Sequence, residues 1–217
     1  CVQHLFDRGC RLVILACNTA SAKALRNIQQ LDLPTIAPDR RVLGVIRPTT
    51  EVIGNYSKTG KVGVLATRGT VTSESYLVEI EKFFPDLDVF QEACPMWVPL
   101  VENGEYASPG ADYFVQQHIS RLLEQSPDID TILLACTHYP LLLNKIRQFV
   151  PPNMTILSQG GIVSKSLVDY LIRHPEMEAQ CSKYGQRTFL TTDSTEDFDR
   201  QATVFYGQPV QSEHLSL

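Results

Sequence analysis

The order of apolar and polar residues along the chain predicts strands that alternate with helices. Three short apolar runs are continuous instead of alternating with polar residues, at positions 11–16, 61–66 and 130–135. Continuous runs rich in branched side chains are typical of buried strands in parallel sheets that helices cover on both faces. Helical spacing of apolar residues follows at 20–30, 72–84, 111–125, 140–149, 163–173 and 196–206. The pattern therefore predicts an α/β fold of mostly parallel sheets flanked by helices.

Helix-start signals and proline-containing breaks in the pattern suggest how the chain is divided into elements and lobes. Ser108 before Pro109 is typical of a helix start, and so is the Ser-Glu-Ser segment at 73–75. The segments 33–40 and 150–153 contain the prolines expected at crossovers between lobes. We expect two pseudo-symmetric lobes, the first formed by residues 1–43 and 158–217 and the second by residues 44–157, with an active site between them.

An internal repeat supports this division. Residues 12–19 (LVILACNT) resemble residues 131–138 (TILLACTH), 119 positions later, and both contain an apolar strand that ends in Leu-Ala-Cys. A spacing of this length fits one duplicated lobe better than a solenoid repeat. The alternative is a chance repeat, because cysteine is common in protein cores. The polar residues that follow each cysteine favour the first interpretation.

The repeat places Cys17 and Cys136 where parallel sheets bind ligands, beyond the carboxyl ends of strands. A following helix N-terminus stabilises a thiolate, so we expect the pKa of both thiols to be lowered toward neutral pH. Hydrogen-bonding groups at Asn18, Thr19, Thr137 and His138 could bind the carboxylate or amine of an amino acid. Two such thiols on facing lobes could remove a proton from one face of a carbon and return one to the other. Paired thiols therefore predict a racemase, whose acid and base exchange roles in the reverse reaction.

Composition narrows the class of protein further. The net charge is −5 without a run of Lys or Arg, which argues against nucleic-acid binding, and no apolar stretch is long enough to span a membrane. Six cysteines without a CxxC pair or a zinc-like cluster indicate reduced thiols and no metal site. We therefore expect a cytoplasmic globular protein.

Four segments resemble the glutamate racemases of the aspartate/glutamate racemase superfamily. They are ACNTASA at 16–22, GVLATRGT at 63–70, CPMWVPLVENGE at 94–105 and ACTHYPLL at 135–142. The resemblance covers nearly the whole chain, although residues 159–217 match only loosely. It implies reversible conversion of L-glutamate to D-glutamate without pyridoxal phosphate or metal, a supply of D-glutamate for peptidoglycan, and a homodimer.

The resemblance also implies roles for individual residues. Cys17 would deprotonate D-glutamate, Cys136 would deprotonate L-glutamate, and His138 and Glu102 would assist around Cys136. Glu102 is preferred to Glu105 by its place in the motif. The α-carboxylate and amine of the substrate would be bound by Asn18, Thr19, Thr67, Thr70 and Thr137. Without the resemblance, Thr67 and Thr70 could equally cap a helix, and the carboxylates and His138 could be ordinary surface or strand-end residues.

Two departures from the family pattern carry expectations of their own. Arg47 lies where the family more often has an acidic residue, so we expect a surface role for it. The family opens with a strand bearing Asp-Ser-Gly and then a Pro-Tyr-Gly segment, and neither is found here. We therefore expect little or no racemase activity from residues 1–217 alone.

Two alternatives stay open at this point. An aspartate or hydantoin racemase could use the same paired thiols, because sequence spacing does not measure pocket length. A small-molecule binding protein with two α/β lobes could close around its ligand with incidental cysteines.

Overall fold

The computed structural model describes residues 1–216, which separate into two compact units. The larger unit contains residues 14–173, and the smaller one contains residues 1–13 together with 174–217. The predicted lobes divide the chain between residues 43 and 44 and between residues 157 and 158, and these boundaries differ from those of the two units. The division into lobes stays a prediction. Among the residues described, no helix is long and apolar enough to cross a membrane.

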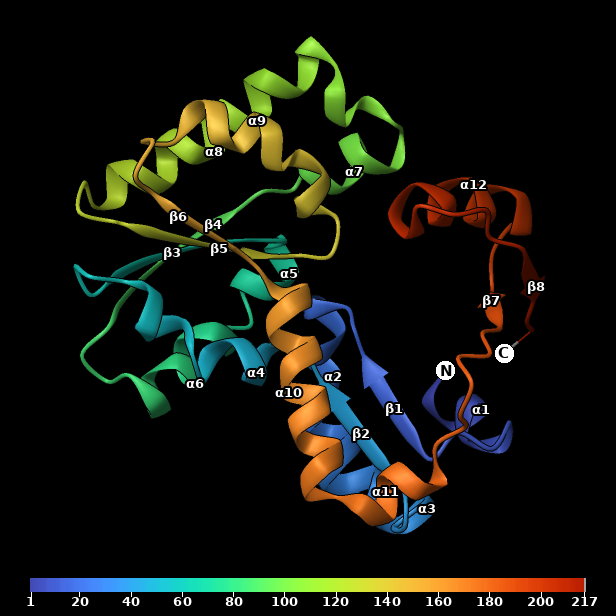
Figure 1. Ribbon diagram of the computed structural model, residues 1–217. Coiled ribbons are helices and arrows are strands. Elements are labelled where there is room, and N and C mark those ends of the chain that lie inside the picture. The colour runs from blue at the N-terminus through green and yellow to red at the C-terminus, as the bar shows by residue number, and fades with distance from the viewer. Residues whose placement is uncertain (217) are drawn as a thin grey trace. The chain divides into compact units, whose positions relative to one another are not determined.

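The larger unit is built around a four-stranded parallel sheet with strand order β4-β3-β5-β6 (Figure 1). Its strands are β3 (Lys61–Ala66), β4 (Asp88–Ala93), β5 (Thr131–Ala135) and β6 (Thr155–Ser158). A separate two-stranded sheet joins β1 (Leu12–Leu15) to β2 (Arg41–Gly44). The three predicted strands are confirmed, and the predicted parallel arrangement is confirmed for β3 and β5.

Helices and helical turns connect these strands. They are α2 (Asn18–Asn27), a π-helical turn (Ile28–Asp32), α3 (Leu33–Ile36), α4 (Ile46–Thr50), α5 (Arg68–Val71), α6 (Ser75–Phe83), α7 (Trp97–Glu102), α8 (Pro109–Gln125), α9 (Leu143–Phe149) and α10 (Gln159–Arg173). Short 3-10 turns lie at Ile53–Tyr56, Glu105–Ala107 and Tyr139–Leu142.

The sheet is covered on both faces, as the continuous apolar runs predict. Helices α8 and α9 lie over one face, and α4 and α6 over the other (Figure 1). Leu65 and Ile132 face the first pair of helices, whereas Val64 and Leu133 belong to the core on the other side. A Cβ atom at Gly63 would come within 2.6 Å of Leu122, so this glycine lets α8 pack closely on the sheet.

A cluster of edge-to-face rings lies in the core between the sheet and α8. The indole of Trp97 is fully buried and packs edge-to-face against Tyr139, with ring centroids 4.8 Å apart, and against His118 at 6.1 Å. His118 Nδ1 lies 2.7 Å from the carboxylate of Glu92. The buried imidazole therefore has the polar partner that burial requires.

The helices of the smaller unit are α1 (Val2–Asp7), α11 (Pro175–Gln180) and α12 (Thr195–Tyr206). Its strands β7 (Phe189–Thr191) and β8 (Ser212–His214) pair in parallel. Ser194 caps α12 by accepting a hydrogen bond from the backbone N–H of Asp197. This helix matches the one predicted at 196–206.

Several predicted helix boundaries differ from the structure; for example, the helix expected from residue 163 begins at Gln159. Two further differences have clear physical reasons. The helix expected from residue 72 begins at Ser75, because the chain first makes the short α5 and then a turn in which Glu74 has φ of 54°. The break expected at 33–40 begins only after α3, because Pro34 lies in the first turn of that helix, where proline is tolerated. Ser108 does precede α8 with Pro109 in its first turn, although its side chain makes no capping hydrogen bond.

Candidate active site

The ends of the four central strands bring four side chains to one edge of the sheet. The register pairs Ala66 of β3 with Ala93 of β4 and with Ala135 of β5, and it pairs Leu134 of β5 with Ser158 of β6. The residues that come next line the carboxyl edge in spatial order Cys94, Thr67, Cys136 and Gln159. Cys136 therefore lies between Thr67 and Gln159, at the edge where parallel sheets bind ligands.

Cys136 is nearly covered, with 8% of its surface exposed. Burial raises the pKa of its thiol to about 11, against the opposing effect of the backbone N–H groups of His138 and Tyr139. The negative charges of Cys17 and Glu102 raise it further. The expectation of a lowered pKa is therefore wrong for Cys136, because the loss of hydration outweighs the two donors.

The predicted partners of Cys136 gather around it. His138 Nδ1 lies 3.8 Å from the Cys136 sulfur and 3.4 Å from the Thr137 hydroxyl. His138 Nε2 lies 3.2 Å from Glu102 Oε1, so the imidazole connects the thiol to a carboxylate. Glu105 is on the next helical turn and is exposed. Glu102 is exposed as well, so the difference between the two carboxylates is the contact of Glu102 with the imidazole, and the choice of Glu102 stays a prediction.

Cys17 has a different setting. It is exposed and occupies the N-cap position of α2, with extended backbone angles and the helix N–H groups directly after it. Thr19, in the first turn of α2, lies within hydrogen-bonding distance of two further predicted residues, 2.7 Å from the Thr67 hydroxyl and 3.2 Å from that of Thr70. Thr67 also caps α5 by accepting a bond from the Thr70 N–H. The three threonines therefore form one hydroxyl cluster.

The start of α2 lies against the strand ends on both sides of Cys136. Thr19 is bonded to Thr67 on the β3 side, and Asn18 Nδ2 donates to Gln159 Oε1 at 2.8 Å on the β6 side. Because Thr67 and Gln159 flank Cys136, these two contacts bring the segment that carries Cys17 to the edge that carries Cys136. The thiols are close enough for the charge of one to affect the other. Such a pair can exchange protons with a small molecule that reaches both sulfurs.

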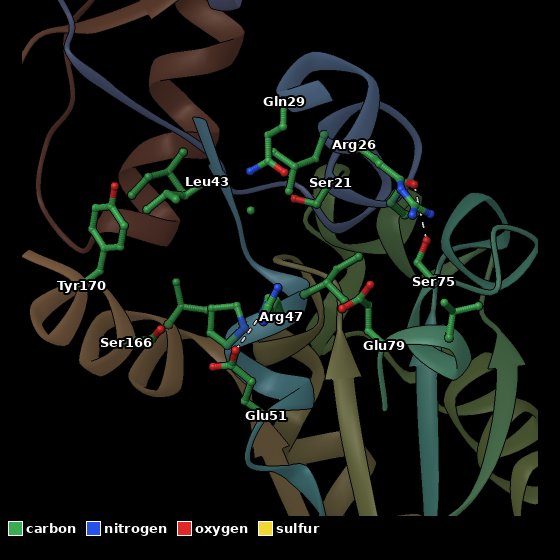
Figure 2. Close-up of a pocket in the computed structure, with 18 of the residues that line it drawn as sticks. Ser21, Arg26, Gln29, Leu43, Arg47, Glu51, Ser75, Glu79, Ser166 and Tyr170 are labelled. Carbon is green, nitrogen blue, oxygen red and sulfur yellow. Dashed lines mark hydrogen bonds and ion pairs between the residues drawn. The ribbon is translucent and has the colours of Figure 1, made fainter. Parts of the chain in front are cut away.

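A separate pocket of about 750 Å³ lies away from both cysteines, among α2, α4, α6 and α10 (Figure 2). Arg47 lines it and is paired with Glu51 at 2.9 Å. Its guanidinium also lies 5.5 Å from the ring of Phe83. The side chain of Arg47 is 69% exposed, so it lies at the surface, as expected. Neither cysteine lines this pocket.

Residues 1–158 match the family described as Asp/Glu/hydantoin racemase. A glutamate racemase from Roseobacter denitrificans is 37% identical over 220 residues, which cover 97% of this chain and 78% of that protein. The chain belongs to the Asp/Glu/hydantoin racemase family. It is therefore an amino-acid racemase, which is an isomerase, and the alternative of a binding protein with incidental cysteines is not supported.

Solved structures agree with this assignment. A glutamate racemase isoform from Bacillus anthracis matches all of this chain and 77% of that one, with a TM-score of 0.87 and 28% identity. A glutamate racemase from Francisella tularensis, solved in complex with D-glutamate, matches 99% of this chain and 76% of that one, with a TM-score of 0.82. At 24% identity the second likeness shows the fold alone.

The sequence did not single out two residues that contact the predicted site of this racemase. Tyr76 and Gln159 both bond to the amide of Asn18. Gln159 directly follows β6 as Cys136 directly follows β5, so recognition of the strand at 155–158 would have pointed to it. Tyr76 carries no comparable signal, because a buried aromatic residue on a helix is ordinary core.

Proposed function

We propose that this chain is a glutamate racemase that uses Cys17 and Cys136 as its two acid–base groups. The observation that carries the proposal is the position of the α2 start, which is bonded to strand ends on both sides of Cys136. The similarity to glutamate racemases supports glutamate as the substrate in preference to aspartate or a hydantoin. Cytoplasmic location, a homodimer and a supply of D-glutamate for peptidoglycan belong to the same proposal.

In the direction from D- to L-glutamate, the Cys17 thiolate takes the α-proton and the Cys136 thiol gives a proton to the opposite face. The raised pKa of Cys136 keeps it protonated at neutral pH, which is the state that a proton donor requires. In the reverse direction the two groups exchange roles. The reaction needs neither pyridoxal phosphate nor a metal ion in this scheme.

The other predicted residues bind and orient the substrate. The hydroxyls of Thr19, Thr67 and Thr70 and that of Thr137 can hydrogen-bond an α-carboxylate or an amine. His138 lies between the Cys136 sulfur and Glu102, so it can stabilise the thiolate that forms when Cys136 removes a proton. Glu102 orients the imidazole through its contact with Nε2.

A thiol footprint tests this proposal directly. Iodoacetamide modification of each cysteine is measured by peptide mass spectrometry, with and without D- or L-glutamate. We expect either enantiomer to protect Cys17 and Cys136 selectively, whereas Cys1 and Cys10 provide unprotected controls. Incorporation of solvent deuterium at Cα of glutamate gives a second measurement that detects slow turnover. Unchanged modification at both site cysteines, together with no incorporation, would contradict the proposed function.

A further inference from the structure

The amide of Asn18, the residue after Cys17, is held in a ring of three hydrogen bonds. The Tyr76 hydroxyl donates to Asn18 Oδ1 at 2.6 Å, and Asn18 Nδ2 donates to Gln159 Oε1 at 2.8 Å. Gln159 Nε2 completes the ring by donating to the Tyr76 oxygen at 2.7 Å. Each side chain donates once and accepts once within the ring, so the three bonds polarise one another in the same sense.

A main-chain carbonyl fixes the direction of this ring. Gln159 Nε2 also lies 3.2 Å from the carbonyl oxygen of Val45, which can only accept. The Gln159 atom that faces Val45 therefore has to be the amide nitrogen, and Gln159 Oε1 is left to face Asn18. Asn18 must then offer its nitrogen to Gln159 and its oxygen to Tyr76. One orientation of the Asn18 amide satisfies every partner.

Burial makes this orientation costly to change. Asn18 is 3% exposed and Tyr76 is fully buried, so water does not replace a lost partner. A rotated Asn18 amide would place nitrogen against a donating hydroxyl and oxygen against the Gln159 oxygen. Such unsatisfied contacts in a buried position carry the full cost of desolvation.

The ring also connects separate elements around the two thiols. Asn18 begins α2 directly after Cys17, Tyr76 lies in α6, and Gln159 follows β6 beside Cys136 at the sheet edge. The ring uses one of the two Asn18 Nδ2 hydrogens and one lone pair of Oδ1. One N–H and one lone pair therefore lie outside the ring.

We propose that Tyr76 and Gln159 are positioning residues that hold the Asn18 amide, through this ring, in the orientation that binds the amino-acid substrate. The inference rests on the proposed function and extends it to two residues outside the set predicted to bind the substrate. It predicts that the Tyr76 hydroxyl matters for ligand affinity at the Cys17 side of the site, and not only for folding.

The test compares two variants that each lose one buried hydroxyl. Tyr76→Phe removes the donor to Asn18, and Tyr139→Phe removes a donor to the main-chain oxygen of Cys94; both tyrosines are fully buried. The D-glutamate concentration that half-protects Cys17 from iodoacetamide is measured for both variants and for the unmodified chain, together with thermal melting. We expect a rise of about tenfold or more in Tyr76→Phe and of less than about twofold in Tyr139→Phe, at similar melting temperatures.

The outcomes separate the two proposals. Equal shifts in both tyrosine variants, or no shift in either, would overturn the positioning role and leave the proposed function intact. Absence of protection in the unmodified chain would contradict both. If Tyr76→Phe does not fold, Gln159→Glu takes its place, because it keeps the side-chain size but puts an oxygen opposite the Val45 carbonyl; the same rise is expected.

Discussion

The two Leu-Ala-Cys segments have nearly the same sequence and quite different surroundings. Cys17 follows β1, a short strand of which only Val13 is fully buried, and it is exposed at the start of a ten-residue helix. Cys136 follows β5, a central strand that is buried throughout, and it leads into a single 3-10 turn. The repeated residues thus place each thiol at a strand end, whereas the neighbouring strands decide how well that thiol is hydrated.

The largest loss of racemisation should come from replacing either Cys17 or Cys136. Cys17→Ser and Cys136→Ser each replace a thiol with a hydroxyl that is far too weak an acid to exchange the α-proton. We expect racemisation, measured by circular dichroism of glutamate, to fall by about a thousandfold or more in both, from the low rate expected of residues 1–217, since general acid–base groups contribute about 10²–10⁴-fold. Cys181→Ser, in the smaller unit, is the matched control. Full racemisation by Cys17→Ser would disprove the two-base scheme.

The burial of Cys136 should appear in how the alkylation rate of its thiol depends on pH. Burial raises the pKa of this thiol to about 11, so the reactive thiolate is a minor species at neutral pH and increases as pH rises toward that value. We expect the alkylation rate of Cys136 in the ligand-free chain to increase about tenfold per pH unit from pH 7 to 9. The measurement is mass-spectrometric labelling at each pH. A rate that levels off by pH 8 would show that Cys136 is more acidic than its burial implies.

The hydroxyl cluster beside Cys17 can be disturbed through Gly69. A Cβ atom there would lie 2.9 Å from Thr19 Cγ2, closer than side chains tolerate. We expect Gly69→Ala to destabilise the protein by about 1–3 kcal/mol in chemical denaturation and to lower racemisation several-fold by moving Thr19. Gly110→Ala, near the start of α8 with only Ser108 Oγ at 3.5 Å, should leave both quantities nearly unchanged. Equal losses in the two variants would argue against this reading of Gly69.

The smallest expected effect concerns the charge near Cys136. Glu102 raises the pKa of the Cys136 thiol, so Glu102→Gln should make the thiol slightly more acidic. The side chain of Glu102 is 45% exposed and its field is screened, hence we expect the alkylation rate of Cys136 to rise only about twofold. Glu105→Gln is the control and should have no effect. A larger response to Glu105→Gln would reverse the choice between the two carboxylates.

Local pattern was sufficient to predict strands β1, β3 and β5 and the six longest helices of the described residues. The run at 61–66 gave both ends of β3, because its apolar residues face cores on both sides of the sheet. Strand β4 was not predicted, because its sequence DVFQEA mixes polar and apolar residues at the edge of the sheet. Strand β6 has only four residues and follows a proline-rich break, so it lacks a clear signal of its own.

Tertiary contacts explain what was missed at the site. The pairing of Asn18 with Tyr76 and Gln159 joins residues 58 and 141 positions apart, and no spacing rule encodes it. The raised pKa of Cys136 likewise depends on the strands on either side of β5. The clustering of Thr19 with Thr67 and Thr70, and of His138 with Glu102, was suggested by family resemblance and not by spacing alone.

The cluster of edge-to-face rings around Trp97 gives the protein an optical reporter of its own. Trp97 is the single tryptophan of the chain, and it lies between Tyr139 and His118 in the same apolar core as Cys136. Its ultraviolet emission therefore comes from this core and from no other part of the molecule. A ligand that changes the packing of this core as it reaches Cys136 would change the surroundings of that indole, so binding at this thiol can be followed without an attached dye.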